Sequence, residues 1–509
     1  MNTNKAIQYL IALVVVMGIL PLHGRSQQGI RPRGDLDVNW KTNIEDLSLL
    51  IDMLLSGVEY HSLYTYAADI NNDQAINIDD VVCLIEGLMQ GELPKMPFYS
   101  GSLPVLFINT EGHRDIVSKE EYLRASWWLE CWEMEEYESI GSEHAQLGML
   151  IKGRGNSTWT NLDKKPYRIR LDDKIEMLGM PANRNWTLQA QALDWMGQVA
   201  DALPFEIGRR MGMAWNPHMK PIEVVLNGQY IGLYYLTEKV RVDKDRVNIV
   251  EQSDLETDPD KVTGGWLLEI DNYSDGDCVK IYEGNGNKFS VRSHSPDVLS
   301  DVQRDYLTSF LQAASDAIYI PNKVSIEWER YIDINALAIY YLVQEVVDNP
   351  EAFSGSCYMS KDRGEDTKLV FGPLWDCSSS FVRYNKDYPF NEFIYENLPS
   401  YCRSVWIGEI VKFPHFQLVV RDYWKHFYEQ VYPEMEAYMD AFAAAVEIAG
   451  KYDHIRWPQY HANNITYRLN RYAKRCFHKK VAWLQSQWGY PSPVDTVPDE
   501  IYPQGYQYH

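Results

Sequence analysis

The stretch QEVVDNPEAFSGSCYMSKDRGEDTKLVFGPLWDCSSSF, residues 344–381, carries the two acids around which we interpret the rest of the chain. Glu351 follows an Asn-Pro pair just past an apolar helical pattern, and Asp376 follows Gly-Pro-Leu-Trp after a short β-type run at 369–371. In phosphoryl transfer one acid orients or deprotonates the attacking hydroxyl, while another holds the metal on the phosphates. An acid at a helix exit and an acid at a strand exit fit these two roles. Solvated loop acids produce the same pattern, so that alternative stays open here.

Four motifs before this stretch and one inside it occur in a fixed order. They are GRGNSTW (153–159), KKPYRIRL (164–171), EVVLNGQYIGLYYLTEKV (223–240), GGWLLEID (264–271) and FGPLWD (371–376). Together they resemble the CotH-type kinase family, which is named for a spore-coat protein. The resemblance implies an α+β, two-lobed domain of the atypical protein-kinase kind, which transfers phosphate from ATP to a protein acceptor with the help of Mg²⁺ or Mn²⁺.

The same resemblance implies roles for the two acids. Glu351 stands where the family usually has a catalytic Asp, and its extra methylene would move the carboxylate by about 1 Å, a shift that can slow a reaction roughly 100-fold. Asp376 is retained and would bind the metal. Ser356 stands at or near a common Asn, and Ser378 replaces a second acid or Asn, although a hydroxyl is a poorer magnesium ligand than a carboxylate.

Four further residues are candidates for nucleotide binding. Arg154 lies in the glycine-containing loop at 153–159, which could lie near phosphates. Lys165 and Arg168 stand on the following strand, as the phosphate-binding lysine of a kinase does. Glu238 lies near the end of an expected hairpin, whose Asn-Gly pair is typical of a two-residue turn. The resemblance places Glu238 at the edge of the nucleotide. A structural turn and exposed strand charges are the plain alternatives.

Near the N-terminus a twelve-residue pattern occurs twice, as DLDVNWKTNIED at 35–46 and DINNDQAINIDD at 69–80. Each copy has oxygen-bearing side chains at positions 1, 3, 5, 9 and 12, and calcium takes six or more oxygen ligands from such loops. The pair resembles a type I dockerin, a small all-α calcium-binding domain that binds a cohesin-like partner. Trp40 and Gln74 replace the usual glycine, so we expect weakened Ca²⁺ binding. The expected ligands are Asp35, Asp37, Asn39, Asn43, Asp46, Asp69, Asn71, Asp73, Asn77 and Asp80.

The chain is expected to be exported, because a lysine and an apolar run at 7–20 precede small residues, as in a secretory signal peptide. No second apolar run of spanning length follows, so we expect a secreted or cell-surface protein without a transmembrane segment after cleavage. An uncleaved anchor is the alternative. The predicted divisions are a signal peptide at 1–26, the dockerin-like pair at 33–92, a linker at 93–102, the kinase-like domain at 103–488 and a tail at 489–509.

Composition excludes some classes of function. The chain has 509 residues, of which 45% are hydrophobic and 13% aromatic, so it is long and apolar enough for several packed domains. The formal net charge of −23 argues against nucleic acid as a partner. The seven cysteines form no C-x-x-C pair, and no H-E-x-x-H or G-x-S-x-G motif occurs. A carboxylate pair for glycoside cleavage and an aromatic sugar-binding surface stay open.

The coarse secondary structure follows from periodicity. The patterns predict a helix over 183–212, a second helix over 325–347, a β-hairpin over 223–240 and a mostly helical region over 413–488. The segment 119–133 is interpreted as a helix or a decorated loop.

Two functions remain open from the sequence. The chain is either an active ATP-dependent kinase, or a pseudokinase that serves as a binding module positioned by its dockerin-like pair.

Overall fold

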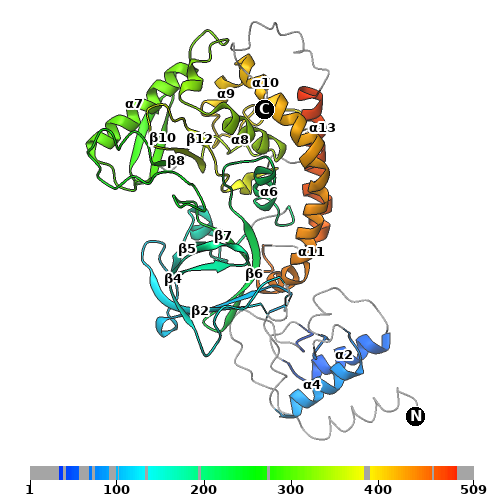
Figure 1. The fold of residues 1–509 in the computed structure, drawn as a ribbon. Coiled ribbons are helices and arrows are strands. Elements are labelled where there is room, and N and C mark those ends of the chain that lie inside the picture. Colours follow the sequence, from blue (N-terminus) through cyan, green and yellow to red (C-terminus); the bar gives the residue numbers. More distant parts are fainter. Residues whose placement is uncertain are drawn as a thin grey trace. The chain divides into compact units, whose positions relative to one another are not determined.

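The computed structural model describes residues 34–37, 42–56, 68–71, 75–90, 99–100, 102–131, 134, 136–192, 196–271, 276–382, 390–460 and 464–489 (Figure 1). The predicted signal peptide, most of the linker, nearly all of the tail and the two loop ligands Asn39 and Asp73 lie outside these residues. Within the described part, no helix combines the length and the apolar character needed to cross a membrane.

The described residues form two compact units. The first consists of Met1–Lys165, Pro221–Tyr234 and Val446–Asn464. The second consists of Pro166–Lys220, Tyr235–Ala445 and Ile465–His509, and it contains both Glu351 and Asp376. Because helices and sheets occur throughout, the structure agrees with the predicted α+β class.

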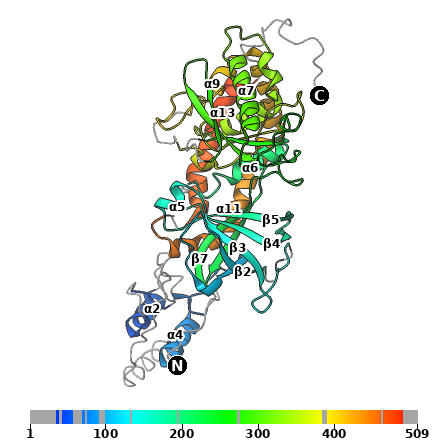
Figure 2. The same ribbon diagram turned by 90° about the vertical axis from the view of Figure 1, so that its left-hand side faces the viewer.

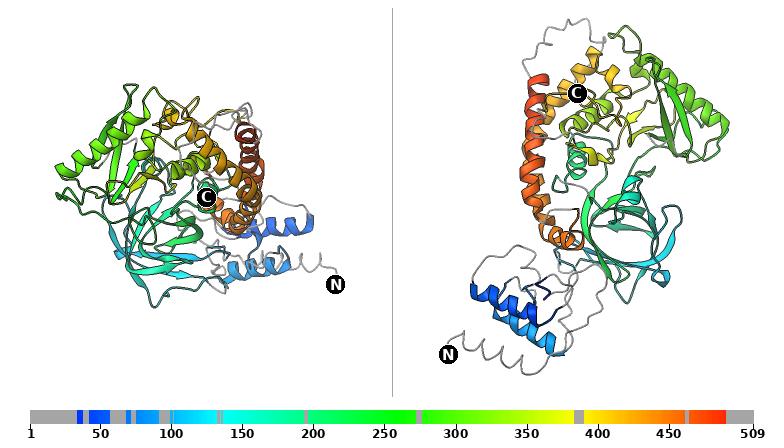
Figure 3. Two further views of the ribbon diagram at one scale, coloured as in Figure 1. Left: turned by 45° about the horizontal axis from the view of Figure 1, so that its top comes forward. Right: turned by 180° about the vertical axis from the view of Figure 1, so that it is seen from behind.

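The repeated N-terminal pattern forms two similar helices, α2 (Ile44–Ser56) and α4 (Ile78–Gln90), which pack side by side (Figure 3). Each helix turns one apolar stripe inward, as its i, i+3, i+4 spacing predicts. The buried residues form one cluster, made of Leu36, Leu47, Leu50, Ile51, Met53, Ala68, Ile70, Val81, Leu84 and Leu88.

Seven strands then close a barrel in the order β1-β2-β3-β4-β5-β7-β6 (Figure 2). Their bounds are β1 Val105–Thr110, β2 Leu123–Glu130, β3 Leu147–Gly153, β4 Tyr167–Met177, β5 Met180–Gln189, β6 Met219–Leu226 and β7 Gln229–Glu238. Asn227 and Gly228 both have positive φ, 53° and 78°, as a two-residue turn requires. The predicted hairpin at 223–240 is therefore confirmed.

Two sequence interpretations were wrong in this region. Segment 119–133 contains the strand β2, in which the buried Ala125 and Trp127 flank the partly exposed Ser126. The long helix expected over 183–212 is instead the end of β5 followed by a short helix, α6 (Ala202–Arg210). Strand pairing overrides the helical spacing, because Trp186 lies opposite Ile169 on β4 and Glu238 on β7.

The second unit also holds a five-stranded sheet in the order β12-β11-β8-β10-β9. The strands are β8 Trp266–Ile270, β9 Cys278–Tyr282, β10 Lys288–Ser295, β11 Cys357–Lys361 and β12 Val370–Phe371. Helix α7 (Asp301–Ile318) begins at a capping box formed by Ser300 and Gln303 and packs against β9.

Helix α8 (Ile334–Val346) is the central helix of this unit. It is shorter than the predicted 325–347 helix, because residues 327–330 form a separate 3₁₀ turn. Eleven of its thirteen residues are buried, so it is apolar on almost every side, which is typical of a core helix. The region after 413 is mostly helical, as predicted: α10 is Pro414–His426, α11 is Tyr432–Arg456 and α13 is Lys474–Trp488.

The end of α8 is held by a buried charge cluster. Lys480 of α13 lies 3.2 Å from the Glu345 carboxylate and 3.0 Å from the Asp348 carboxylate, and all three side chains are fully buried. Its ammonium group also donates a 2.6 Å hydrogen bond to the carbonyl of Glu392. Because α8 leads directly to Glu351, this cluster fixes where that acid leaves the helix.

Replacing Lys480 by Met should therefore destabilise the second unit by about 3 kcal/mol or more, because two buried carboxylates lose the cation that lies 3.2 Å and 3.0 Å from them. Thermal or urea unfolding measures the change. The matched control is Lys479→Met, which removes an exposed lysine next to it. Equal melting of the two variants would show that the cluster does not hold the helix end.

Candidate active site

The turn after α8 fixes the backbone at Glu351. Asp348 adopts positive φ (48°), which ends the helix, and the Asn349 amide donates to Gln344 Oε1 at 2.9 Å. The Asn349 side-chain oxygen accepts the backbone N–H of Glu351 at 3.2 Å. The Asn-Pro-Glu sequence thus forms a turn that is tied back to the last residues of the helix.

A second turn carries Asp376 out of strand β12. Its backbone is left-handed (φ 52°, ψ 53°), and its side chain is exposed while Trp375 and Cys377 on either side are buried. The N–H of Cys377 donates to the buried carboxylate of Asp201 at 2.5 Å. The chain is therefore pinned on both sides of Asp376, and its carboxylate faces outward.

The two turns meet through hydrogen bonds. The N–H of Phe381 donates to the carbonyl of Val347 at 3.0 Å, which joins the second turn to the end of α8. Ser379 Oγ donates to Glu351 Oε2, and Ser378 Oγ donates to Asp376 Oδ1 at 2.9 Å. Two consecutive serines thus bind the two acids, which are 25 residues apart in sequence.

The two carboxylates also interact electrostatically. Burial raises the pKa of Glu351 above the ordinary value, the negative charge of Asp376 raises it further, and the Ser379 hydrogen bond opposes both effects. Two repelling carboxylates in a partly buried site favour a cation near them.

The donor set of these two carboxylates could hold one magnesium ion. Mg²⁺ is usually held by one or two carboxylates, and water and phosphate oxygens complete its octahedron. Asp376 is the exposed donor, and Glu351 is the second carboxylate. Among the described residues, no cluster of three acids, histidines or cysteines forms here. The phosphates would have to supply the remaining ligands.

Two of the predicted nucleotide-binding residues lie on adjacent parts of the barrel wall. Arg168 on β4 is opposite Thr187 on β5, which is opposite Thr237 on β7, next to Glu238. Arg168 Nε is buried without a hydrogen-bond partner in the described chain. Glu238 is also buried, and its Oε2 accepts the backbone N–H of His218 at 3.0 Å while Oε1 has no such partner.

Sequence reasoning missed two cations beside them. Burial lowers the pKa of Lys239 to about 7, and the positive charge of Arg168 contributes in the same direction. Arg246 donates to the Lys239 carbonyl at 2.7 Å, and its Nη2 is buried without a described hydrogen-bond partner. Concentrated positive charge with unsatisfied N–H donors fits an anion such as a phosphate. The sequence signal for these two cations is the charged segment EKVRVDKDR, residues 238–246.

A chain of hydrogen bonds links this wall to the acidic turn. Gln189 stands two residues beyond Thr187 on β5, hence on the same face and about 7 Å farther along the strand. The Gln191 amide lies 3.3 Å from Gln189 Oε1 and 2.6 Å from Asp201 Oδ2. Because Asp201 also holds the N–H of Cys377, the strand end and the Asp376 turn are connected through one carboxylate.

Arg154 and Lys165 belong to the first unit and to a loop that packs on itself. Lys165 Nζ donates to the carbonyl of Trp159 at 2.7 Å and lies 5.6 Å from its ring centroid. A Cβ at Gly153 would come within 2.3 Å of that ring, so glycine is required there. These contacts support the structural-turn interpretation of residues 153–159.

The repeat of the N-terminal loops extends to their hydrogen bonds. The Asp46 carboxylate accepts from the backbone N–H groups of Leu36 (2.6 Å), Asp37 (3.1 Å) and Asn43 (2.9 Å). Asp80, 34 residues later, accepts from Ile70 (2.6 Å), Asn71 (3.2 Å) and Asn77 (2.8 Å). Oxygen atoms of Asp35, Asp37 and Asp46 lie within 4.8 Å of one another, a spacing that fits one cation.

Comparison with known families assigns the chain to a family. Residues 151–486, more than half of the chain, match the family described as CotH kinase protein. The chain belongs to this CotH family. A search of curated proteins finds no significant match. The matched region of the CotH domain begins within β3, so β1 and β2 lie before it although they help to close the barrel. Family membership suggests a kinase-like function, and both acids lie inside the matched range.

The burial of Glu351, together with the negative charge of Asp376, predicts a pH-dependent stability. A carboxyl group whose folded pKa is raised reduces stability as pH rises above its unfolded value of about 4.3. Glu351→Gln should therefore melt like the wild type near pH 4 and at a higher temperature near pH 7.5. Differential scanning fluorimetry checks this, with the exposed Glu429→Gln as control. A pH-independent difference would mean that the Glu351 carboxyl group is not held in a buried site beside Asp376.

Proposed function

We propose that the chain is an atypical protein kinase of the CotH type, which transfers phosphate from ATP to a protein outside the cytoplasm. The observation that carries the proposal is that the turn after helix α8 and the turn after strand β12 contact each other at Glu351 and Asp376. Ser379 donates to Glu351, and the neighbouring Ser378 donates to Asp376. Phosphoryl transfer needs little covalent chemistry from a protein and depends on positioning and charge stabilisation.

Each part of the site has a role in this proposal. Asp376 holds Mg²⁺ or Mn²⁺, which supplies charge neutralisation on the phosphates when it is bound. Glu351 orients or deprotonates the acceptor hydroxyl, and its raised pKa brings it closer to the pH at which a general base works well. Arg168, Lys239 and Arg246 stabilise the negative charge of the nucleotide phosphates.

One observation favours the alternative, a pseudokinase that acts as a binding module. Where the family often has a second acid or Asn, Ser378 offers a hydroxyl that already donates to Asp376. The site then holds metal with two carboxylates, one of which is hydrogen-bonded to Ser379. Such a site would bind Mg²⁺ weakly without a nucleotide.

We also propose that the N-terminal helices are a calcium-dependent, dockerin-like module that binds a cohesin-like partner. The duplicated Asp46 and Asp80 hydrogen bonds support this, since both loops enter their helices in the same way. Equivalent positions of the two helices also expose apolar side chains, Ile44 and Ile78 and then Leu55 and Met89, which are 38% to 57% exposed. Such residues suit contact with a protein partner.

The kinase proposal is tested with labelled ATP, Mg²⁺ or Mn²⁺ and a mixture of secreted proteins as acceptors. Asp376→Ala should abolish transfer, and Glu351→Gln should reduce the rate about 100-fold or more. Asp366→Ala, which removes an exposed acid elsewhere in the unit, should retain wild-type transfer. A wild-type protein that shows neither transfer nor a nucleotide-induced rise in melting temperature would leave the binding-module function.

Calcium binding is tested by titrating the full chain in a calorimeter. We expect weak, saturable binding that a double Asp35→Asn, Asp37→Asn change reduces by about one site, because each loop needs its carboxylate oxygens. At a free Ca²⁺ concentration about 100 times the Kd, the module should gain about 2.7 kcal/mol of stability. Heat identical to buffer injection, with no thermal shift, would refute the calcium proposal.

A further inference from the structure

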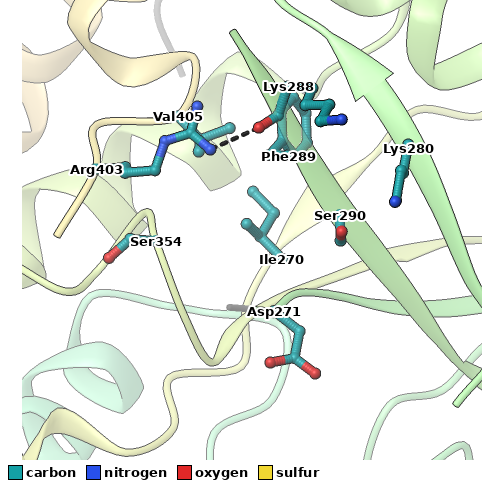
Figure 4. A pocket seen from close by; sticks show the side chains of 9 residues that line it. All are labelled: Ile270, Asp271, Lys280, Lys288, Phe289, Ser290, Ser354, Arg403 and Val405. Carbon is teal, nitrogen blue, oxygen red and sulfur yellow. Dashed lines mark hydrogen bonds between the residues drawn. The ribbon is translucent and has the colours of Figure 1, made fainter. Parts of the chain in front are cut away.

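A cavity of about 230 Å³ lies in the second unit, beside the five-stranded sheet (Figure 4). Residues of the strands β8, β9 and β10 line one part of it, together with Asp271, which follows β8. The turn that continues from Glu351 and the segment 403–405 line the rest. None of its lining residues belongs to the barrel wall that carries Arg168, Lys239 and Arg246. The cavity is thus separate from the cations that we assign to the nucleotide phosphates.

The lining is rich in positive charge although the chain as a whole has a net charge of −23. Lys280 on β9, Lys288 on β10 and Arg403 surround the cavity together with one acid, Asp271 (Figure 4). Arg403 is already paired, since it lies 2.9 Å from the buried carboxylate of Glu283. The side chains of Lys280 and Lys288 form no hydrogen bond or ion pair within the described chain, so they supply the excess charge.

Arg403 is also fixed in place for recognition. Its Nη1 donates to the carbonyl of Lys288 at 2.6 Å (Figure 4). The other oxygen of Glu283 accepts from the Tyr319 hydroxyl. This anchoring holds the 403–405 segment against β10. The two lysines, by contrast, stand on flexible stems and can adapt to an anion.

The cavity adjoins the backbone of the proposed catalytic acid through one lining residue. Ser354, which lines it, donates to the carbonyl of Glu351 through its N–H at 2.9 Å and through its hydroxyl at 3.2 Å. One edge of the cavity is therefore hydrogen-bonded to the backbone of the residue whose side chain would orient the acceptor hydroxyl.

Its size favours one side chain over a whole nucleotide. Pockets for drug-sized ligands measure roughly 300–1,000 Å³, which is larger than this cavity. Ile270, Phe289 and Val405 are largely or fully buried and provide an apolar wall for a short aliphatic stem. Cations at the rim and carbon atoms inside fit the carboxylate and methylenes of an Asp or Glu side chain.

We propose that this cavity binds an acidic side chain of the protein acceptor next to the hydroxyl that is phosphorylated, so that the kinase selects serine or threonine within acidic segments. This inference rests on the proposed kinase function. Lys280 and Lys288 supply charge-assisted hydrogen bonds to the carboxylate, and Arg403 maintains the positive potential. The substrate class is thus an acidic peptide segment that carries a hydroxyl.

The experiment uses the full chain and two labelled peptides, each with a central serine flanked either by aspartates or by asparagines. Fluorescence anisotropy without ATP measures binding, and labelled ATP measures transfer. The wild type should bind the acidic peptide at least about tenfold more tightly than the neutral one, as one or two charged hydrogen bonds allow. Lys280→Met with Lys288→Met should remove that preference and leave the KM for ATP unchanged.

The control is Lys425→Met with Lys479→Met, which removes the same net charge from exposed positions elsewhere. If the control loses the preference equally, only the overall charge matters and the proposal is wrong. A raised KM for ATP with an unchanged peptide preference would assign the cavity to the nucleotide and also overturn it. Lys280→Glu provides a second variant, which should reverse the preference toward a lysine-flanked peptide.

The experiment distinguishes a failure of the kinase proposal from a failure of the acidic-peptide proposal. A chain that transfers no phosphate, yet binds the acidic peptide through Lys280 and Lys288, contradicts the kinase proposal but retains the acidic-peptide site. A chain that transfers phosphate with equal efficiency to both peptides, and binds them equally, retains the kinase function and eliminates the acidic-peptide site. Asp376→Ala separates the two further, because it should bind the acidic peptide as the wild type does.

Discussion

The buried ammonium group of Lys480 is the constraint on which the candidate site depends. Glu345 and Asp348 end helix α8 with two carboxylates in the interior, and Lys480 lies close to both. Burial raises the pKa of Glu345, while Lys480 opposes that effect. An isolated ion in a protein interior costs several kcal/mol, so α8 can end inside the unit only because α13 brings a cation to it. The position of Glu351 is therefore set by the position of that helix end.

From this fixed point the site is assembled mainly by backbone hydrogen bonds. The Asp376 turn is tied to the end of α8 through Phe381 and to the segment after β5 through Asp201. Side-chain hydroxyls then connect the turn to the two acids. A cation and a phosphate would therefore meet carboxylates whose backbones are already ordered, which reduces the entropy lost on binding.

The charge of the protein is distributed unevenly, and the proposed nucleotide site and the proposed peptide site have separate groups of cations. The chain is strongly acidic overall, yet cations gather at two places in the second unit. One group lies on the barrel wall around Lys239, where burial and neighbouring guanidinium groups lower the lysine pKa to about 7. The other lines the cavity beside Glu351. Local positive potential in an acidic protein attracts anions to defined points rather than to the whole surface.

The sequence by itself determined the family, the Asn-Gly hairpin and the two acids at element ends, because these depend on local motifs and turn chemistry. It misassigned the β2 segment and the end of β5, where partners far along the chain pair with residues whose spacing looks helical or irregular. Only the tertiary structure decided that Glu351 and Asp376 meet, that Lys480 neutralises the end of α8, and that Lys239 and Arg246 join Arg168. Distance, burial and hydrogen-bond satisfaction are properties of the packed chain, and no local pattern encodes them.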